Sequence, residues 1–170
     1  MKFNLTAKKN FEAAKNLTKS VKIIHDNQVY VGIPQEEASR PGEGITNAEL
    51  LYVQTYGSPA NKIPPRPLLE PAIEEGMERL RKKQREALDA ALQGNEAKAI
   101  DGLRKCGMQA VNEVRAYFTK FPDNGWPPNK PRVIRRKLKK GSTHPIPLID
   151  TGELRKSITY VLITKGGRKK

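Results

Sequence analysis

The sequence predicts an α+β fold in which a small, mainly antiparallel sheet packs against two long helices, with extended loops between the elements. Three observations support this prediction. Apolar residues recur every three or four positions between residues 67 and 121, as in helices, and they alternate near both ends of the chain, as in strands. The 13 prolines include clusters that predict extended loops. The length of 170 residues suits one domain.

The first predicted element is a β-hairpin over residues 21–33. A three-residue loop at 26–28 keeps the apolar residues on one face, because it pairs His25, Ile23 and Val21 with Val29, Val31 and Ile33. A two-residue turn would instead pair Lys22 with Val31 and mix the two faces. With the longer loop, His25 is expected to be a packed, neutral histidine rather than a metal ligand.

A short helix is predicted over residues 45–57. Thr46 and Glu49 have the spacing of a capping box at its start, and Gly57 can end it in a left-handed conformation. Long loops are expected on either side, at about residues 34–46 and 57–67. The second loop contains four prolines, which exclude a regular helix and stiffen the segment.

The two long helices are predicted from apolar faces on either side of a break at Gly94 and Asn95. The first helix, over residues 67–93, would bury a face made of Leu69, Ile73, Met77, Leu80, Gln84, Leu88 and Ala91. The second would bury Ile100, Leu103, Gly107, Ala110, Val114, Phe118 and Phe121. Close approach of the helices is expected at Gly102, Gly107 and Ala110. Cys106 lies beside this second face, which favours a buried thiol over a nucleophile.

A third long loop is expected at about residues 121–147. Trp126 within it is interpreted as an anchor that packs against the body, with base stacking as the alternative. Pro131 can begin a short basic helix that runs to Lys140. Asp150 and Glu153 have capping-box spacing for a single helical turn. The alternating residues Ile158, Tyr160 and Leu162 then predict a strand that joins the N-terminal hairpin.

The charge is concentrated near the C-terminus. The chain has 32 basic and 18 acidic residues, a net charge of +14, and residues 129–170 alone carry 13 basic and 2 acidic side chains. A dense basic run attracts polyanions, although a solvated surface is the simpler interpretation. The candidate contacts for a polyanion or partner are Arg135, Arg136, Lys137, Lys139 and Lys140. The basic tail at 166–170 is expected to be flexible.

Several classes of protein are disfavoured. No apolar run is long enough for a membrane span, and no apolar segment follows the first lysines, so we expect a soluble protein without a signal peptide. The single cysteine excludes disulfide scaffolds and thiolate metal sites. Glycine-rich phosphate loops, HExxH and GxSxG are absent, and His25 and His144 are the two histidines. Catalysis, a metal and a cofactor are therefore not expected.

Three segments of the chain resemble one known family. The matching positions are Asn47, Ala48, Tyr56, Gly57, Ile63, Pro64, Arg66 and Pro67 in residues 47–73, Pro127, Pro128, Ile134, Arg136 and Lys137 in 125–137, and Leu148 to Gly152 with Leu154, Ser157 and Ile158 in 147–160. Their order and spacing are similar to those of the virion-morphogenesis and tail-completion (neck) proteins of tailed bacteriophages. Leu68 and Leu69 depart from the family, which often has an aromatic residue there.

The resemblance implies a structural, non-enzymatic virion protein in the neck or tail, made in the host cytoplasm, that joins head and tail or completes the tail. It implies a ring of copies, six-fold or twelve-fold, that binds neck, connector or tail proteins, with a possible DNA contact and no membrane. The candidate assembly interface comprises Ile63, Pro64, Arg66, Pro67, Trp126, Asp150, Thr151, Gly152 and Arg155. The alternative is a basic nucleic-acid-binding protein, favoured by the net charge and by Trp126 beside the basic segment. An enzyme has the least support.

Overall fold

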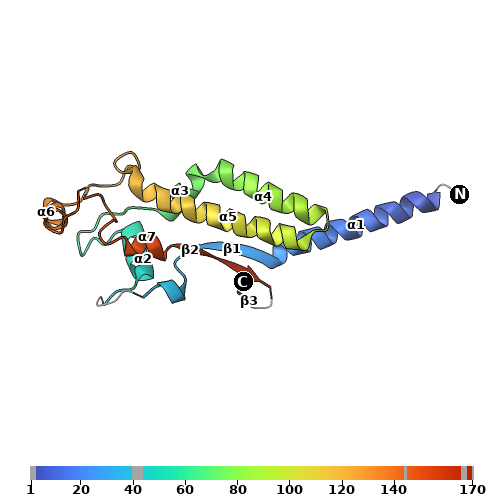
Figure 1. Ribbon diagram of the computed structural model, residues 1–170, viewed down its shortest axis with the longest axis horizontal. Coiled ribbons are helices and arrows are strands. Elements are labelled where there is room, and N and C mark those ends of the chain that lie inside the picture. The colour runs from blue at the N-terminus through green and yellow to red at the C-terminus, as the bar shows by residue number, and fades with distance from the viewer. Residues whose placement is uncertain (1–2, 40–43, 144, 166–167, 170) are drawn as a thin grey trace. The chain divides into compact units, whose positions relative to one another are not determined.

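The computed structural model describes residues 3–39, 44–143, 145–165 and 168–169. They group into two compact units. Figure 1 labels the helices and strands. Unit 1 comprises the residues up to Tyr30, Glu78–Gln109 and those from Val161 onward, and unit 2 comprises Val31–Met77 and Ala110–Tyr160. The α+β fold with a small antiparallel sheet and two long helices is confirmed.

Unit 1 contains α1 (Phe3–Asp26), most of α4 (Met77–Leu92), the first part of α5 (Glu96–Tyr117) and parts of the sheet. The strands are β1 (Asn27–Gly32), β2 (Thr159–Thr164) and β3 (Arg168–Lys169), in the order β1-β2-β3. β3 is antiparallel to β2. The backbone N–H of Lys165 donates to the Asp26 carbonyl at 2.7 Å, which places the start of β1 beside the end of β2, as in an antiparallel pair.

The core of unit 1 joins the sheet to the two long helices. Ala87 of α4, Leu103 of α5 and Leu162 of β2 are buried together, and Ile24, Val29 and Ile100 pack against them. The helices approach closely at Gly102, where an added Cβ would lie 2.8 Å from the Ala87 Cβ. The predicted close contact is thus confirmed at Gly102, because a residue with a side chain would overlap α4.

The predicted hairpin is wrong in its first half. Residues 21–26 continue α1, and the partner of β1 is β2. Helical spacing places Ser20, Ile23 and Ile24 on the side that meets α4, where the Ser20 hydroxyl donates to the Ala91 carbonyl at 2.7 Å. His25 is exposed, which corrects the expectation of a packed histidine. A short stretch of alternating apolar residues fits either a strand or a helix. At residues 21–26, the contact with α4 favours the helix.

The first long helix is also not continuous. It breaks at Gly76 into α3 (Leu69–Glu75) and α4, and a Cβ at Gly76 would lie 2.5 Å from Cγ of Glu113 in α5. The predicted buried face of α4 is corrected as well, since Gln84 and Leu88 are exposed. The residues that are buried are Leu80, Ala87, Ala90 and Ala91. Small side chains replace large ones because α5 lies so close.

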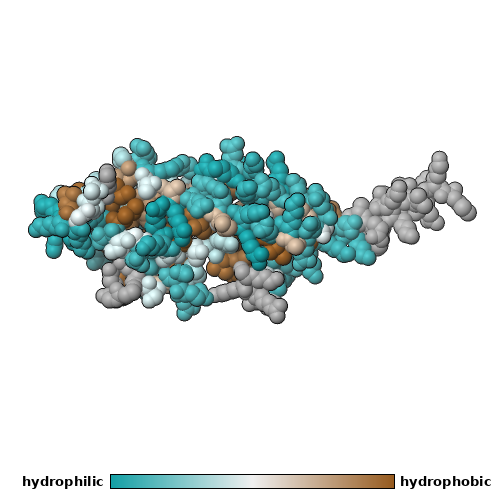
Figure 2. All heavy atoms as spheres, in the orientation of Figure 1, coloured by the Kyte–Doolittle hydropathy of each residue, from teal (hydrophilic) through white to brown (hydrophobic). Residues whose placement is uncertain are grey.

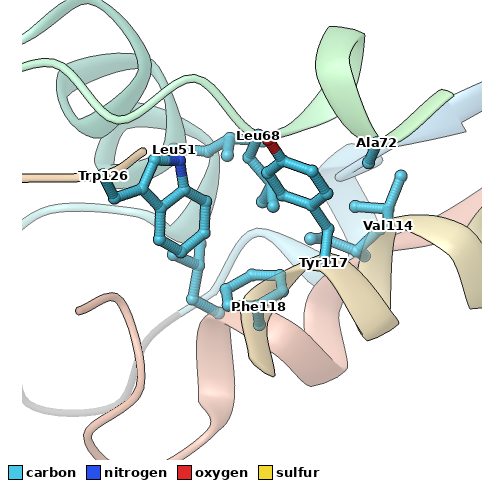
Figure 3. Packing of buried hydrophobic residues seen from close by; sticks show 9 residues of the cluster. Leu51, Leu68, Ala72, Val114, Tyr117, Phe118 and Trp126 are labelled. Carbon is cyan, nitrogen blue, oxygen red and sulfur yellow. The ribbon is translucent and has the colours of Figure 1, made fainter. Parts of the chain in front are cut away.

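Unit 2 contains α2 (Asn47–Tyr56), α3, the end of α5, α6 (Pro131–Lys139), α7 (Glu153–Ser157) and the short 3-10 helices η1 (Gln35–Glu37) and η2 (Phe118–Lys120). Its core contains the aromatic residues Tyr117, Phe118 and Trp126, which lie close together in Figure 3. The buried residues are Leu51, Leu68, Ala72, Val114, Tyr117, Phe118, Trp126, Leu154 and Ile158.

The predicted helix starts have different outcomes. Thr46 and Glu49 form the capping box of α2, and Pro131 begins α6, as expected. Gly57 follows α2 with φ 76° and ψ 178°, a positive φ outside the left-handed helical region. The capping box predicted for Asp150 and Glu153 is wrong. α7 begins after Gly152, at φ 84°, and the Glu153 N–H faces the Thr151 hydroxyl at 3.4 Å.

The expected loops contain more structure than their composition suggested. The first includes η1, with residues 40–43 outside the described part. The third includes α6, which is the short basic helix predicted from Pro131, with His144 outside the described part. Arg168 and Lys169 form β3 rather than a flexible tail, while residues 166, 167 and 170 lie outside the described residues. Hydrophilic residues dominate the face in Figure 2. No helix among the described residues is long and apolar enough to cross a membrane.

Candidate functional site

Residues from both predicted sets meet around one pocket of about 540 Å³ in unit 2. Ile63, Pro64 and Arg66 line it from the proline-rich segment. α6 and the residue after it contribute Arg136, Lys137 and Lys140, and Asp150 lines it from the segment before α7. Sequence segments that are more than 60 residues apart therefore share one surface, which we call the basic pocket.

The proline-rich segment is held in a tight loop. Ser58 and Ile63 form an antiparallel bridge with two backbone hydrogen bonds of 2.9 Å, so the chain reverses between them. Gly57 permits this, because a Cβ there would lie 2.8 Å from the Ile63 carbonyl oxygen. Lys62 has φ 54°, an uncommon backbone conformation for lysine, at the exposed side of the loop. The backbone thus fixes where Lys62 enters the pocket lining.

Arg66 ties the proline-rich segment to the loop after Trp126. Its side chain is only 6% exposed. Nε donates to the Pro127 carbonyl at 2.9 Å, Nη2 to the Pro128 carbonyl at 3.1 Å and Nη1 to Oε1 of Gln54 at 3.3 Å. Burial lowers the pKa of the guanidinium. Arg66 therefore links two segments inside the fold. Its hydrogen-bond partners are neutral, so they do not compensate the positive charge of the guanidinium.

Trp126 is the anchor that its position in the loop predicted. It is 4% exposed, and its Nε1–H donates to the Pro67 carbonyl at 2.8 Å. Its ring meets Tyr117 and Phe118 edge to face, with centroids 5.7 and 6.3 Å apart (Figure 3). Since the indole is buried in the core, Trp126 serves the fold rather than an exposed contact.

Lys137 requires a correction to the predicted contact set. Its side chain is 4% exposed, and Nζ donates to the carbonyls of Ile146, at 2.7 Å, and Ile149. Burial is the main cause that lowers its pKa, and Asp150 acts in the opposite direction. Lys137 therefore holds the 146–149 segment against α6 and is not free to contact a partner from the outside.

The other basic residues of α6 and the residue after it remain on the surface. Arg132, Arg135, Arg136, Lys139 and Lys140 are all exposed. The helix itself has no acidic residue, and three of its cations lie in the last turn, where the helix dipole favours positive charge. Lys140 Nζ lies 3.7 Å from Asp150. The exposed cations thus form a continuous basic face from the pocket edge to the outside of α6.

The remaining predicted interface residues form the turn before and within α7. Arg155 donates through Nε to the Arg115 carbonyl at 3.0 Å, and Arg115 donates to the carbonyls of Lys156 and Ile158. Asp150 and Thr151 are exposed, and Gly152 supplies the positive φ that the turn needs. This turn is therefore fixed to the end of α5 and presents Asp150 at the pocket.

Sequence reasoning did not single out two surface features. Tyr52 and Tyr56 of α2 are 65% and 67% exposed, with ring centroids 4.9 Å apart. Their spacing of four residues on a predicted helix was the available signal. A second pocket of about 670 Å³ lies in unit 1 beside α1 and is lined by Lys19, Lys22, Asp26 and Glu96. Part of its lining comes from α1. The sequence analysis predicted a hairpin over residues 21–33 instead of this helix, so the pocket was not expected.

Cys106 is buried, and burial raises the pKa of its thiol. Within the described ranges, no three His, Cys, Asp or Glu side chains gather in a way that could hold a metal ion. The chemistry that the basic pocket offers is electrostatic attraction and hydrogen-bond donation to an anionic group.

Comparison with known proteins returns no relative. No protein-family model, no curated protein and no solved structure matches this chain.

Proposed function

We propose that the protein is a structural component of a tailed-bacteriophage particle that acts in the neck or tail, in head–tail joining or tail completion. The resemblance of the three sequence segments to virion-morphogenesis and tail-completion proteins is the starting point. The observation that carries the proposal is that these segments bind one another in unit 2. Arg66 of the first binds Pro127 and Pro128 of the second, and Lys137 of the second binds Ile149 of the third.

Two surface features support a role in assembly. The exposed pair Tyr52 and Tyr56 offers aromatic area of the kind enriched in protein interfaces. The basic face of α6 offers charge that a partner can complement. In a ring of six or twelve copies, heterologous contacts would use different surfaces of neighbouring copies, which suits a chain with several distinct exposed patches.

The test is negative-stain microscopy of lysates from the encoding phage after inactivation of this gene, with a plasmid copy as the complementation control. Separate filled heads and tails, or tails of abnormal length, are the expected result, and the plasmid should restore complete particles. Complete, infectious particles without the gene product would contradict the proposal.

A second candidate function is nucleic-acid binding. It is favoured by the exposed cations of α6, which lie on a helix without an acidic residue. Such binding would weaken steeply with salt, because each neutralised phosphate releases counterions. Trp126 gives this alternative no support, since its buried ring cannot stack on a base.

A further inference from the structure

We propose that the basic pocket binds carboxylate side chains from an acidic segment of a different protein. This inference rests on the proposed function and names the chemistry of one assembly partner.

The lining of the basic pocket has a large excess of positive charge. Six cationic side chains line it: Lys62, Arg66, Lys130, Arg136, Lys137 and Lys140. Among the described lining residues, Asp150 is the single carboxylate. Its oxygen lies 3.7 Å from Lys140 Nζ, and it also acts to raise the pKa of Lys137. Cations that line one concave surface raise the local concentration of anionic groups.

The two deepest cations are not neutralised by their hydrogen-bond partners. Arg66 and Lys137 are 6% and 4% exposed, yet they donate only to neutral carbonyl and amide oxygens. Buried charges in proteins are normally paired, because desolvation without a counter-charge is unfavourable. Carboxylates bound by the exposed cations of the pocket would add counter-charge near these two buried groups without having to contact them. The pocket volume of about 540 Å³ lies within the common range for ligand sites.

An acidic protein segment fits better than the alternatives. A DNA duplex presents phosphates on a convex surface, so it would meet exposed residues such as Arg132 and Arg135 before cations as buried as Arg66. A second copy of the chain has a net charge of +14, which disfavours it as the occupant of this pocket but leaves other surfaces free for contacts within a ring. A flexible acidic side chain from another protein can reach into the pocket, and its negative charge is attracted to the cations there.

The experiment is calorimetric titration of the full chain with a hexaglutamate peptide at 100 mM NaCl. Two variants remove the same charge from different places. Lys62→Asn/Lys140→Gln changes exposed residues that line the pocket, and asparagine suits the positive φ at position 62. Arg135→Gln/Lys139→Gln changes exposed residues of α6 that do not line the basic pocket. We expect about five- to tenfold weaker binding for the first and less than twofold for the second, because salt screens the distant charges.

A third variant should improve binding, which misfolding cannot mimic. Asp150→Asn removes the single carboxylate from the described lining and should tighten peptide binding about threefold. Absence of peptide binding, equal loss in both double variants, or no gain in Asp150→Asn would each overturn the proposal.

Two further measurements test the other possible occupants of the pocket, a DNA duplex and a second copy of the chain. Tighter binding of a 20-base-pair duplex than of the peptide, abolished by Arg135→Gln/Lys139→Gln, would replace the inference with nucleic-acid binding. Sedimentation in which the unmodified chain self-associates and Lys62→Asn/Lys140→Gln stays monomeric would assign the pocket to a second copy. Peptide binding with normal particles in the gene-inactivated phage would contradict the proposed function alone, and separated heads and tails without peptide binding would contradict this inference alone.

Discussion

At the scale of single residues, buried cations that donate to backbone carbonyls build the candidate site. Arg66 joins the proline-rich segment to Pro127 and Pro128, and Lys137 joins α6 to the segment before α7. Backbone carbonyls in loops have no helix or sheet partner, so a buried donor that satisfies them stabilises an irregular segment. These side chains therefore replace regular secondary structure as the means of holding the loops.

The Arg66→Lys variant tests this role. An ammonium on a flexible chain cannot reach three separated acceptors, so buried carbonyls would be left without a donor. We expect the free energy of unfolding to fall by about 1–3 kcal/mol, measured by urea denaturation followed by circular dichroism. Arg135→Lys, at an exposed position on α6, is the matched control and should change stability by less than about 0.5 kcal/mol. Equal stability of the two variants would refute the structural role of Arg66.

At the scale of elements, the contact between α4 and α5 determines which residues the helices bury. Ala87, Ala90 and Ala91 are buried, whereas Leu88 and Leu92 are 43% and 48% exposed. The cause is the short separation at Gly102, where the α4 backbone and the Ala87 methyl group fill the space of a side chain. Small residues on both helices thus form the close contact near Gly102, and Leu88 and Leu92 face solvent.

The Gly102→Ala variant should overlap α4. A methyl group would lie 2.8 Å from the Ala87 Cβ and 2.9 Å from its Cα. Alanine has the higher helix propensity by up to about 1 kcal/mol, but overpacking should outweigh this and lower the free energy of unfolding by about 1–2 kcal/mol. In the double variant with Ala87→Gly, the loss should be smaller than the sum of the two single losses, as measured by urea denaturation. Strict additivity would show that the two positions do not interact.

At the scale of the whole molecule, the net charge of +14 dominates the electrostatics. The excess is greatest in residues 129–170, which include α6. Exposed ion pairs such as Lys105 with Asp101 contribute little to stability in water. Like charges therefore repel one another in the folded chain, and a polyanionic or acidic partner would relieve that repulsion.

Added salt should stabilise the isolated protein. Raising NaCl from 10 to 100 mM shortens the screening length from about 30 to about 10 Å, which weakens the repulsion between cations. We expect the midpoint of thermal unfolding to increase, measured by differential scanning calorimetry. The Arg135→Gln/Lys139→Gln variant has two fewer positive charges and should show a smaller increase. A midpoint that falls with salt would mean that attractive ion pairs outweigh the repulsion.

The sequence alone determined the elements whose signals are local. The capping box of Thr46 and Glu49, the first-turn proline at Pro131 and the break at Gly94 and Asn95 depend on neighbouring residues, and all three are present. The fold class, the small residue Gly102 at the helix contact and the anchor Trp126 could also be predicted. Part of the lining of the basic pocket was predicted from the sequence, because the proline-rich segment and the basic run are conspicuous in composition, but its cations Lys62 and Lys130 were not among the predicted residues.

Only the tertiary structure decided the features that depend on distant contacts. Residues 21–26 are helical because α4 covers their apolar face. The long helix breaks at Gly76, where the Glu113 side chain of α5 leaves no space for a Cβ. Asp150 lies near Lys140 instead of capping α7. The buried Lys137 donates to carbonyls 9 and 12 residues further along the chain. The spacing of residues along the chain predicts which side chains share one face of a helix or strand. Whether that face is buried depends on which element packs against it, and only the tertiary structure determines that element.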